Sequence, residues 1–537
     1  MKERNLFNSW VFAYFLVVLV FFMSHGLMLF VYGAWWDDML LMDNLAPEPV
    51  DDYLGSSGIN NPFLNFIISS LNGVVDCYAR NFYSRFLPFL CWLISLSCFF
   101  VVLKKITKNK SYTLFASLFA SSCGVNKTMI LVCCYHYSIS ISLFMLGLLF
   151  FVDDFYRAKN STKIIVSMLW TLSVLVWRSA VLVIPLAMFI SVFCKIDNKN
   201  NYNLKSISFI FFRILFKQYW QILLGLLVFS ILYVTILAPG GKYAVYYSIG
   251  YLNLLTSPIT TIFVCVSLLL GYLSNILSVF SKLGFESIII VVVISAFYLF
   301  LLSLIMKRDD REQLKTSILW LACIFLFFSM LPHLFRDIVL SFDIDGYKSR
   351  VASLAVFPVS MIYAFFLCRI MNHRIRIIIG SIIVALSSFY CVNIYFDYEK
   401  GWLKNEALAD FFKHHDYLKG KTLVCIDNSS FYSSFPVETY RNYEYEGCAK
   451  LAYGKNDSTK CFAYNDLKQI SSTIDASYFI YINIQEPIDV IEIRNNVGFK
   501  SLFYRFNNTQ KRDNLKKGLF MYRIETKEEF HRARDVE

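Results

Sequence analysis

Long apolar runs separated by short polar connections occupy most of this chain. The first run, Trp10 to Tyr32, is nearly uncharged, and at about 1.5 Å per residue it is long enough to cross the hydrocarbon core of a membrane. Similar runs predict spanning helices at 10–32, 86–103, 111–125, 129–151, 163–177, 179–194, 218–237, 288–306, 317–332, 351–368 and 376–396. The pattern therefore predicts a mainly α fold, a polytopic helical membrane bundle.

One stretch fits this pattern less well. Ile259 to Phe280 is apolar enough to span, but a single crossing there inverts the sidedness of everything downstream. We therefore expect zero or two crossings within 243–281, and about eleven to thirteen spans in total. An even number keeps Lys307-Arg308 and Arg374 on the cytoplasmic side.

The pattern changes near residue 396. The tail that follows is polar and of domain size, and three of its segments are rich in the β-branched and aromatic residues typical of strands. These segments are Thr422 to Ile426, Tyr478 to Ile482 and Leu519 to Ile524, and they alternate with helix-compatible stretches such as Leu403 to Phe412 and Asp466 to Ser472. We expect two domains: a transmembrane domain at 1–396, with a first outer loop at 33–85, and a small extracytoplasmic α/β domain at 397–537.

Composition agrees with this class. The chain is 57% hydrophobic and 18% aromatic, which is far above a soluble globular protein. Lys2 and Arg4 precede the first span, so the positive-inside rule predicts a cytoplasmic N-terminus, and an odd number of spans puts the tail outside. Cations gather in the loops assigned to the cytoplasm, so the net charge of +12 needs no nucleic-acid partner.

The fourteen cysteines are spread along the chain, mostly within apolar runs, where a free thiol behaves as a small hydrophobe. Their spacing matches no zinc site, so we predict no metal ligands and no cofactor, and a requirement for a divalent cation stays open. Cys425, Cys448 and Cys461 lie in the tail. An oxidising compartment would allow Cys448 and Cys461 to close a short disulfide loop.

An acidic pair, Asp37-Asp38, follows the first span in the sequence Trp35-Trp36-Asp37-Asp38. Two adjacent carboxylates at the membrane boundary are costly, because each disfavours the ionisation of the other and both lie near low dielectric. The simpler interpretation is the start of a solvated loop. The sharper one is a catalytic carboxylate that serves a lipid-bound substrate, with Trp36 able to stack on a sugar face.

Few cations lie near the membrane on the outer side. They are Arg178, Lys242, Arg336, Lys348 and Arg350, and His333 accompanies them. A single Arg or Lys at the membrane boundary usually extends its side chain to the lipid headgroups. This is the alternative interpretation for each of the five cations. Taken together, the five cations can converge on one cavity mouth, where an Arg fork holds a phosphate through two hydrogen bonds.

Carboxylates that face such cations suit one reaction well. When a sugar leaves a lipid phosphate, cations neutralise the departing phosphate, and a carboxylate accepts the proton of the incoming hydroxyl. The lipid tail of the donor remains in the bilayer, beside the membrane boundary.

At this point the chain resembles a known family. A first span with its N-terminus inside, the acidic pair at the start of the first outer loop, many spans and an outer C-terminal domain resemble the GT-C glycosyltransferases. The position of Trp36-Asp37-Asp38 is similar to that in bacterial O-antigen glucosyltransferases of the phage-conversion (Gtr) type. The resemblance implies a hexosyltransferase of the bacterial inner membrane that uses a polyprenyl-phosphate sugar and a glycan acceptor. It also implies that Asp37 and Asp38 include the catalytic base and that the outer Arg residues bind prenyl phosphate.

The chain departs from that pattern in two places. An Arg usually follows the acidic pair and a Gly-Arg precedes the second span, where this chain has Met39-Leu40-Leu41 and Asn60-Asn61-Pro62. The identity of the sugar, glucose included, therefore stays open. An O-antigen or polysaccharide polymerase, and a transporter of lipid-linked glycans, remain alternatives. Ionisable residues in mid-span, more frequent in transporters, are nearly absent from these runs.

Overall fold

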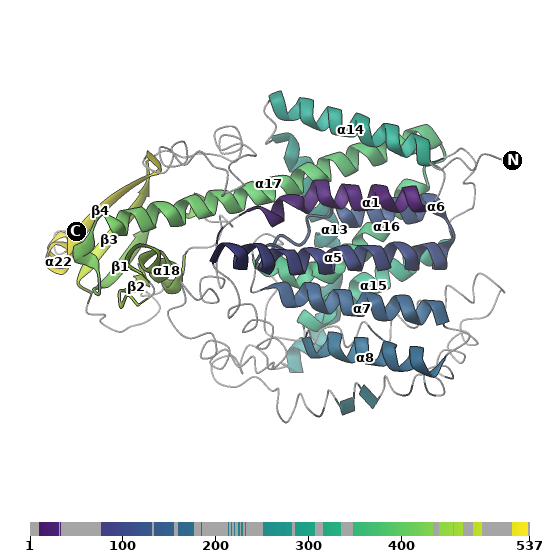
Figure 1. Ribbon diagram of the computed structural model, residues 1–537, viewed down its shortest axis with the longest axis horizontal. Helices are drawn as coiled ribbons and strands as arrows, with labels where there is room; N and C mark the ends of the chain where they lie inside the picture. Colours follow the sequence, from purple (N-terminus) through teal and green to yellow (C-terminus); the bar gives the residue numbers. More distant parts are fainter. Residues whose placement is uncertain are drawn as a thin grey trace.

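The protein consists of a helical bundle joined to a small sheet domain (Figure 1). The computed structural model describes residues 10–31, 33, 77–131, 134–154, 159–176, 184, several single positions within 213–231, 251–281, 285–306, 315–334, 347–432, 440–454, 456–464, 476–485 and 518–534. The first helix of the chain begins toward one end of the long axis, and the C-terminal domain lies at the other. We call the two ends of the bundle the N-terminal end and the domain end.

The bundle is built from helices that run along this long axis (Figure 1). The first ones are α1 (Trp10–His25), continued by the 3-10 turn η2 (Gly26–Leu29), then α5 (Cys77–Thr107), α6 (Lys110–Ser121), α7 (Tyr135–Asp154) and α8 (Asn160–Val176). They are followed by α13 (Tyr251–Ser281), α14 (Phe285–Ile305), α15 (Ser317–Leu334), the 3-10 helix η5 (Tyr347–Ala355), α16 (Val356–Cys368) and α17 (His373–Lys413).

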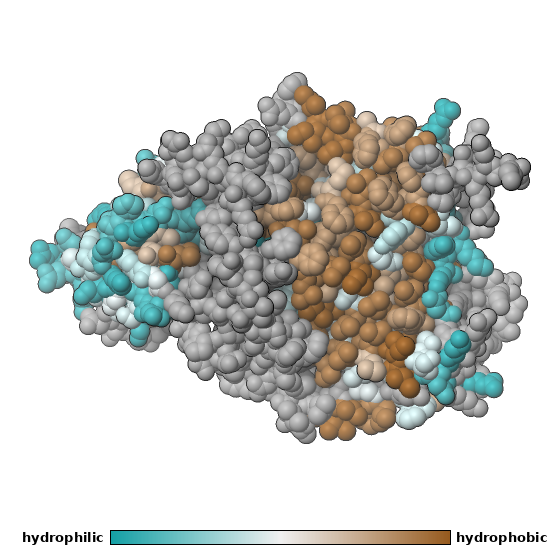
Figure 2. Space-filling view, viewed as in Figure 1, coloured by the Kyte–Doolittle hydropathy of each residue, from teal (hydrophilic) through white to brown (hydrophobic). Residues whose placement is uncertain are grey.

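Within the described residues, eight helices are long and apolar enough to cross a membrane. Figure 2 shows the corresponding hydrophobic band across the bundle, with hydrophilic residues at both ends of the molecule. On α13 and α14 the band is made of exposed apolar side chains such as Leu255, Ile259 and Val293. An apolar surface of this extent is typical of a face covered by lipid or by another protein, and the architecture is compatible with a multi-pass membrane protein.

Most of the predicted spans coincide with these helices. The agreement covers 10–32, 86–103, 129–151, 288–306, 317–332, 351–368 and 376–396, and the run at 163–177 corresponds to the shorter apolar helix α8. The run at 111–125 forms the 12-residue helix α6, which is buried among the other helices. The runs at 179–194 and 218–237 lie outside the described residues, apart from single positions.

Within 243–281, zero or two crossings were expected from the placement of cations on the cytoplasmic side. Residues 251–281 form one continuous helix, α13, and its segment Leu255–Phe280 has the length of a single span. The hydroxyl residues that interrupt the apolar pattern are compatible with this helix. Thr260 and Thr261 donate their hydroxyl hydrogen bonds to carbonyls one turn back, at 3.1 and 2.6 Å, so they add no unpaired polar group to the span.

Cationic side chains mark the N-terminal end of the bundle. The ammonium of Lys104 lies 5.1 Å from the ring centroid of Trp10, at the start of α1. Lys110 Nζ donates a 2.9 Å hydrogen bond to the carbonyl of Ile305, and the ring of His373 contacts the carbonyl of Met306 at 3.1 Å. The end of α14 and the starts of α6 and α17 therefore lie on the same side as the start of α1.

Helix α17 connects the two parts of the molecule without a break. It has 41 residues, so it is about 60 Å long at 1.5 Å per residue. The domain boundary drawn from the sequence, between 396 and 397, falls inside it. The stretch Leu403 to Phe412, expected to be helical, is its last part, and Phe411 there stacks on Tyr522 of the sheet domain at 4.3 Å between ring centroids.

The C-terminal domain contains a four-stranded mixed sheet. The strands are β1 (Thr422–Asp427), β2 (Lys460–Ala463), β3 (Tyr478–Ile484) and β4 (Phe520–Thr526), with α18 (Asn442–Tyr453) between β1 and β2 and α22 (Lys527–Arg534) after β4. The order is β2-β1-β3-β4, in which β1 is parallel to both neighbours and β4 is antiparallel to β3. The three predicted strands are confirmed, and β2 is an additional one. Asp466 to Ser472 lies outside the described residues.

The two faces of the sheet have different cores. Leu423, Cys425 and Ile480 belong to the main core, which continues through α18 into α17, whereas Phe479 on the opposite face stacks on Phe530 of α22 at 3.7 Å. Cys425, Cys448 and Cys461 are buried free thiols. The disulfide considered between Cys448 and Cys461 is therefore not formed: Cys461 points into the sheet core beside Cys425, whose thiol contacts it, and Cys448 contacts Asn405 at 3.7 Å.

Candidate functional site

The structure describes part of the predicted site. Six of the predicted residues lie outside the described residues: Trp36, Asp37, Asp38, Arg178, Lys242 and Arg336. Lys348 lies in η5, where the backbone is described. His333 is buried near the end of α15, and Arg350 is half-buried in η5, which packs on α15. The structure therefore brings two of the predicted residues, His333 and Arg350, to the same end of the bundle.

Arg85 is a buried cation that the sequence analysis missed. It stands where the apolar part of α5 begins, is 1% exposed, and donates hydrogen bonds to the carbonyls of Val31 and Gly33. Gly33 has a φ of +147°, a conformation that favours glycine. Arg85 thus fixes the chain four residues before Asp37. A charge buried at the edge of a span is costly unless it is paired, and these carbonyls provide the pairing.

A second polar contact joins the loop after α6 to η5 and α17. The backbone amide of Lys127 donates to Ser349 Oγ at 3.2 Å, and the hydroxyl of Tyr398 donates to the carbonyl of Lys127 at 2.8 Å. The ammonium of Lys127 lies 5.8 Å from the ring centroid of Tyr390. Because Arg350 follows Ser349 in η5, two cations from different segments lie in this region.

The middle of α17 contributes a third group of polar residues at this end of the bundle. The ring of His25, at the end of α1, is hydrogen-bonded to the hydroxyl of Tyr395 at 2.8 Å. One to two turns further along, Glu399 and Lys400 are 1% and 3% exposed, and Lys400 Nζ lies 3.6 Å from Asp397 Oδ1. Such charges are rare in a bundle interior, and they concentrate where functional sites of membrane proteins lie.

We call this set of residues the polar layer. Its members come from α1, α5, the α6–α7 loop, η5 and α17, all at the domain end of the bundle: His25, Arg85, Asn126, Lys127, Ser349, Arg350, Asn393, Asp397, Glu399 and Lys400. Four cations stand against two carboxylates in it. An excess of cations at a membrane boundary suits an anionic group such as a phosphate. Across the described ranges, no group of three His, Cys, Asp or Glu side chains is arranged to hold a metal ion.

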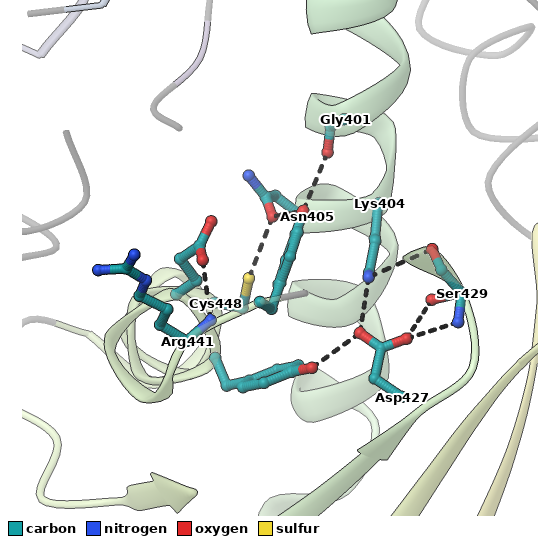
Figure 3. Close-up of polar contacts among 10 residues, drawn as sticks. Gly401, Lys404, Asn405, Asp427, Ser429, Arg441 and Cys448 are labelled. Carbon is teal, nitrogen blue, oxygen red and sulfur yellow. Dashed lines mark hydrogen bonds and ion pairs between the residues drawn. The ribbon is translucent and has the colours of Figure 1, made fainter. Parts of the chain in front are cut away.

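A buried ion pair fastens α17 to the sheet domain (Figure 3). Lys404 Nζ lies 2.6 Å from Asp427 Oδ2, and the two side chains are 0% and 7% exposed. The hydroxyl of Tyr445 donates to the same carboxylate oxygen at 2.8 Å, and the backbone amide of Ser429 donates to the other at 2.8 Å. The ammonium also lies 3.8 Å from the ring centroid of Tyr440, so both charges are surrounded by partners.

Electrostatics keep Asp427 charged in this position. Burial alone raises the pKa of a carboxyl group, but the charge and hydrogen bond of Lys404, with the hydrogen bonds from Ser429 and Tyr445, hold the pKa of Asp427 below its ordinary value. Burial and the neighbouring Asp427 raise the pKa of Tyr445, so that phenol stays protonated and keeps donating. We interpret this cluster as the structural joint between the bundle and the domain, one helical turn beyond Lys400.

Comparison with known proteins leaves the family of this chain open. No family model matches it, and no curated protein is significantly similar to it in sequence. The class that the fold defines is a helical bundle with span-length apolar helices and a C-terminal sheet domain. A more specific function has to be argued from the residues themselves.

Proposed function

We propose that this protein is a membrane glycosyltransferase that moves a sugar from a polyprenyl-phosphate donor to a cell-surface glycan such as O-antigen. The observation that carries the proposal is the polar layer. Polar and charged residues from five segments of the chain converge at one end of a bundle that is otherwise apolar on its surface. A reaction that takes one substrate from lipid and the other from water needs polar groups at this depth.

The proposed roles follow from the chemistry of the residues. Asp37 or Asp38 accepts the proton of the acceptor hydroxyl, and Arg85 supports this role because it fixes the chain four residues earlier. Arg350 and Lys348, with Arg178, Lys242 and Arg336, bind the donor phosphate, and Lys127 and Lys400 add to the cationic surroundings. Trp36 and His333 contact the sugar. The proposal needs no resident cofactor.

The proposed location is the bacterial inner membrane, with the N-terminus in the cytoplasm and the sheet domain on the opposite face. The cations Lys104, Lys110, Arg374 and Arg376 at the N-terminal end of the bundle support this orientation, because cationic residues are enriched on the cytoplasmic side. In this orientation the polar layer faces the periplasm, where surface glycans are modified.

The orientation predicts the result of a fusion experiment. A reporter enzyme that is active only in the cytoplasm, fused after Glu537, should stay inactive, and the same reporter fused in the loop before Lys163 should be active. A periplasmic reporter at the two positions should give the opposite pattern. A strong cytoplasmic signal after Glu537 would contradict the orientation and remove the sidedness on which the proposed site depends.

The function itself is tested by comparing surface glycans from cells with and without the protein. We expect the repeat unit from deleted cells to lose the mass of one sugar, and a plasmid-borne copy to restore it. A change in the chain-length distribution with an unchanged repeat unit would support a polymerase instead. Accumulation of lipid-linked glycan on the cytoplasmic face would support a transporter.

A further inference from the structure

The parallel part of the sheet has the topology of open α/β folds that bind ligands. Strand β1 lies between β2 and β3, and the chain passes from β1 to β2 on one side and then to β3 on the other. In such sheets, ligands bind outside the carboxyl ends of the strands, at the point where the connections change direction. Here that point lies between the ends of β1 and β3.

This edge of the sheet faces the bundle. Helix α17 leads away from the bundle and ends at Lys413, and β1 then runs back along it, because Asp427 at the end of β1 contacts Lys404, nine residues before the helix end. Lys404 is one helical turn, about 6 Å, beyond Lys400 of the polar layer. The carboxyl edge and the polar layer are therefore neighbours along α17.

Two asparagines meet at this edge. Asn428 follows β1 and Asn483 is near the end of β3, and Asn428 Nδ2 donates a 2.8 Å hydrogen bond to Asn483 Oδ1 at an exposed position. The backbone amide of Asn428 is held at 2.9 Å by the carbonyl of Ile482, so the pair is fixed on the sheet. Asn428 Oδ1 and Asn483 Nδ2 make no hydrogen bond to any described residue. The pair thus offers one acceptor and one donor side by side.

The surroundings of the pair determine which ligand it suits. A sugar hydroxyl both donates and accepts a hydrogen bond, as a carboxamide does, so an asparagine pair matches two hydroxyls of one ring. A phosphate would need a cation, and among the described residues Lys404, beside this edge, is buried and neutralised by Asp427. The Asp427 network beneath the edge also keeps the pair in place, which lowers the entropy cost of binding.

We propose that Asn428 and Asn483 form a binding subsite for the hydroxyl groups of a neutral glycan, held between the sheet domain and the polar layer. The inference rests on the proposed function, in which such a glycan is the acceptor. It assigns the sheet domain the task of holding the glycan while its reacting hydroxyl reaches the membrane boundary.

The test is a binding experiment on the full chain in lipid nanodiscs. The probe is neutral oligosaccharide from the host's surface polysaccharide, released by mild acid and labelled with a fluorophore at its reducing end, and fluorescence anisotropy reports binding. We expect the Asn428→Ala, Asn483→Ala double variant to bind about tenfold more weakly, the loss of two hydrogen bonds of ordinary strength. The control is Asn456→Ala, an exposed asparagine just before the start of β2, at the amino edge, which should bind as the wild type does.

The outcomes separate this site from the proposed function. Unchanged affinity in the double variant, absence of binding by the wild type, or displacement of the probe by inorganic phosphate at the same edge would each overturn the subsite. The Asp37→Asn variant should bind the probe normally. Weakened binding in the double variant, together with no sugar transfer by the wild type, would keep the subsite and overturn the transferase proposal. Transfer that depends on Asp37, with unchanged binding in the Asn428→Ala, Asn483→Ala double variant, would keep the transferase proposal and overturn the subsite.

Discussion

Replacing Asp37 or Asp38 by asparagine should abolish sugar transfer while the folded protein stays in the membrane. Asparagine keeps the size of the side chain and much of its hydrogen bonding, but it cannot accept a proton from the incoming hydroxyl. General-base catalysis contributes about 10²–10⁴-fold, so a loss of that size is expected for the residue that acts as the base. We favour Asp37, because it is closer to the end of the first span and so to the lipid phosphate.

The measurement is transfer from a prenyl-phosphate sugar to the glycan acceptor by purified variants that are present at equal levels. Asp51→Asn is the matched control, since Asp51 is a carboxylate of the same predicted outer loop without an assigned role. It should leave transfer unchanged. Near-normal transfer by both single variants and by the double variant would contradict the mechanism, and loss of the protein from the membrane would indicate a structural pair.

The apolar pattern predicted the helical part of the fold because lipid-exposed segments have no alternative to a helix. Every backbone polar group in the membrane has to be paired within its own segment, so length and composition nearly suffice. At α13 the apolar pattern alone indicated a span-length segment, which the structure has as one helix, whereas the sidedness of Lys307-Arg308 and Arg374 favoured zero or two crossings. The strands β1, β3 and β4 were found from β-branched and aromatic residues, and β2, with only four residues, was too short to stand out.

The site was harder to predict because its partners are far apart in sequence. Arg85 reads as an ordinary boundary cation, and only the folded chain shows it bonded to carbonyls 52 and 54 residues earlier. Likewise, Lys404 and Asp427 are both common surface residue types, and their burial follows from β1 running back along α17. The acidic pair was singled out by its position after the first span, which is a property of the sequence alone.

Breaking the buried Lys404–Asp427 pair should destabilise the sheet domain strongly. In the Lys404→Ala variant, Asp427 is left as a buried charge without its cation, and breaking a buried pair in this way costs about 3–5 kcal/mol. Replacing both partners, as in Lys404→Met with Asp427→Leu, should cost less, because no charge is then left buried. Trp402, which lies two residues before Lys404 and donates to Glu406 at 3.0 Å, provides a fluorescence signal for urea unfolding of this region.

The contribution of Asp427 to the free energy of unfolding should depend on pH in a defined direction. The pKa of Asp427 is lower in the folded protein than its ordinary value of 3.8, so the unfolded chain takes up a proton first as the pH falls. The stability that Asp427 contributes is therefore fully present above about pH 4 and is lost below it. The difference in unfolding free energy between the wild type and Asp427→Asn should shrink in that acidic range.

A surface pair of the same domain supplies the control for this result. Arg532 and Glu528 lie 3.9 Å apart on α22, with side chains 81% and 84% exposed, and such pairs contribute little to stability. Arg532→Ala should therefore leave the unfolding curve unchanged, while Lys404→Ala shifts it. Equal and small shifts in both variants would show that Lys404 and Asp427 are solvated in the folded protein. The domain would then be held to α17 by apolar contacts such as Phe411 on Tyr522, and its edge would lack the rigid support on which the glycan subsite depends.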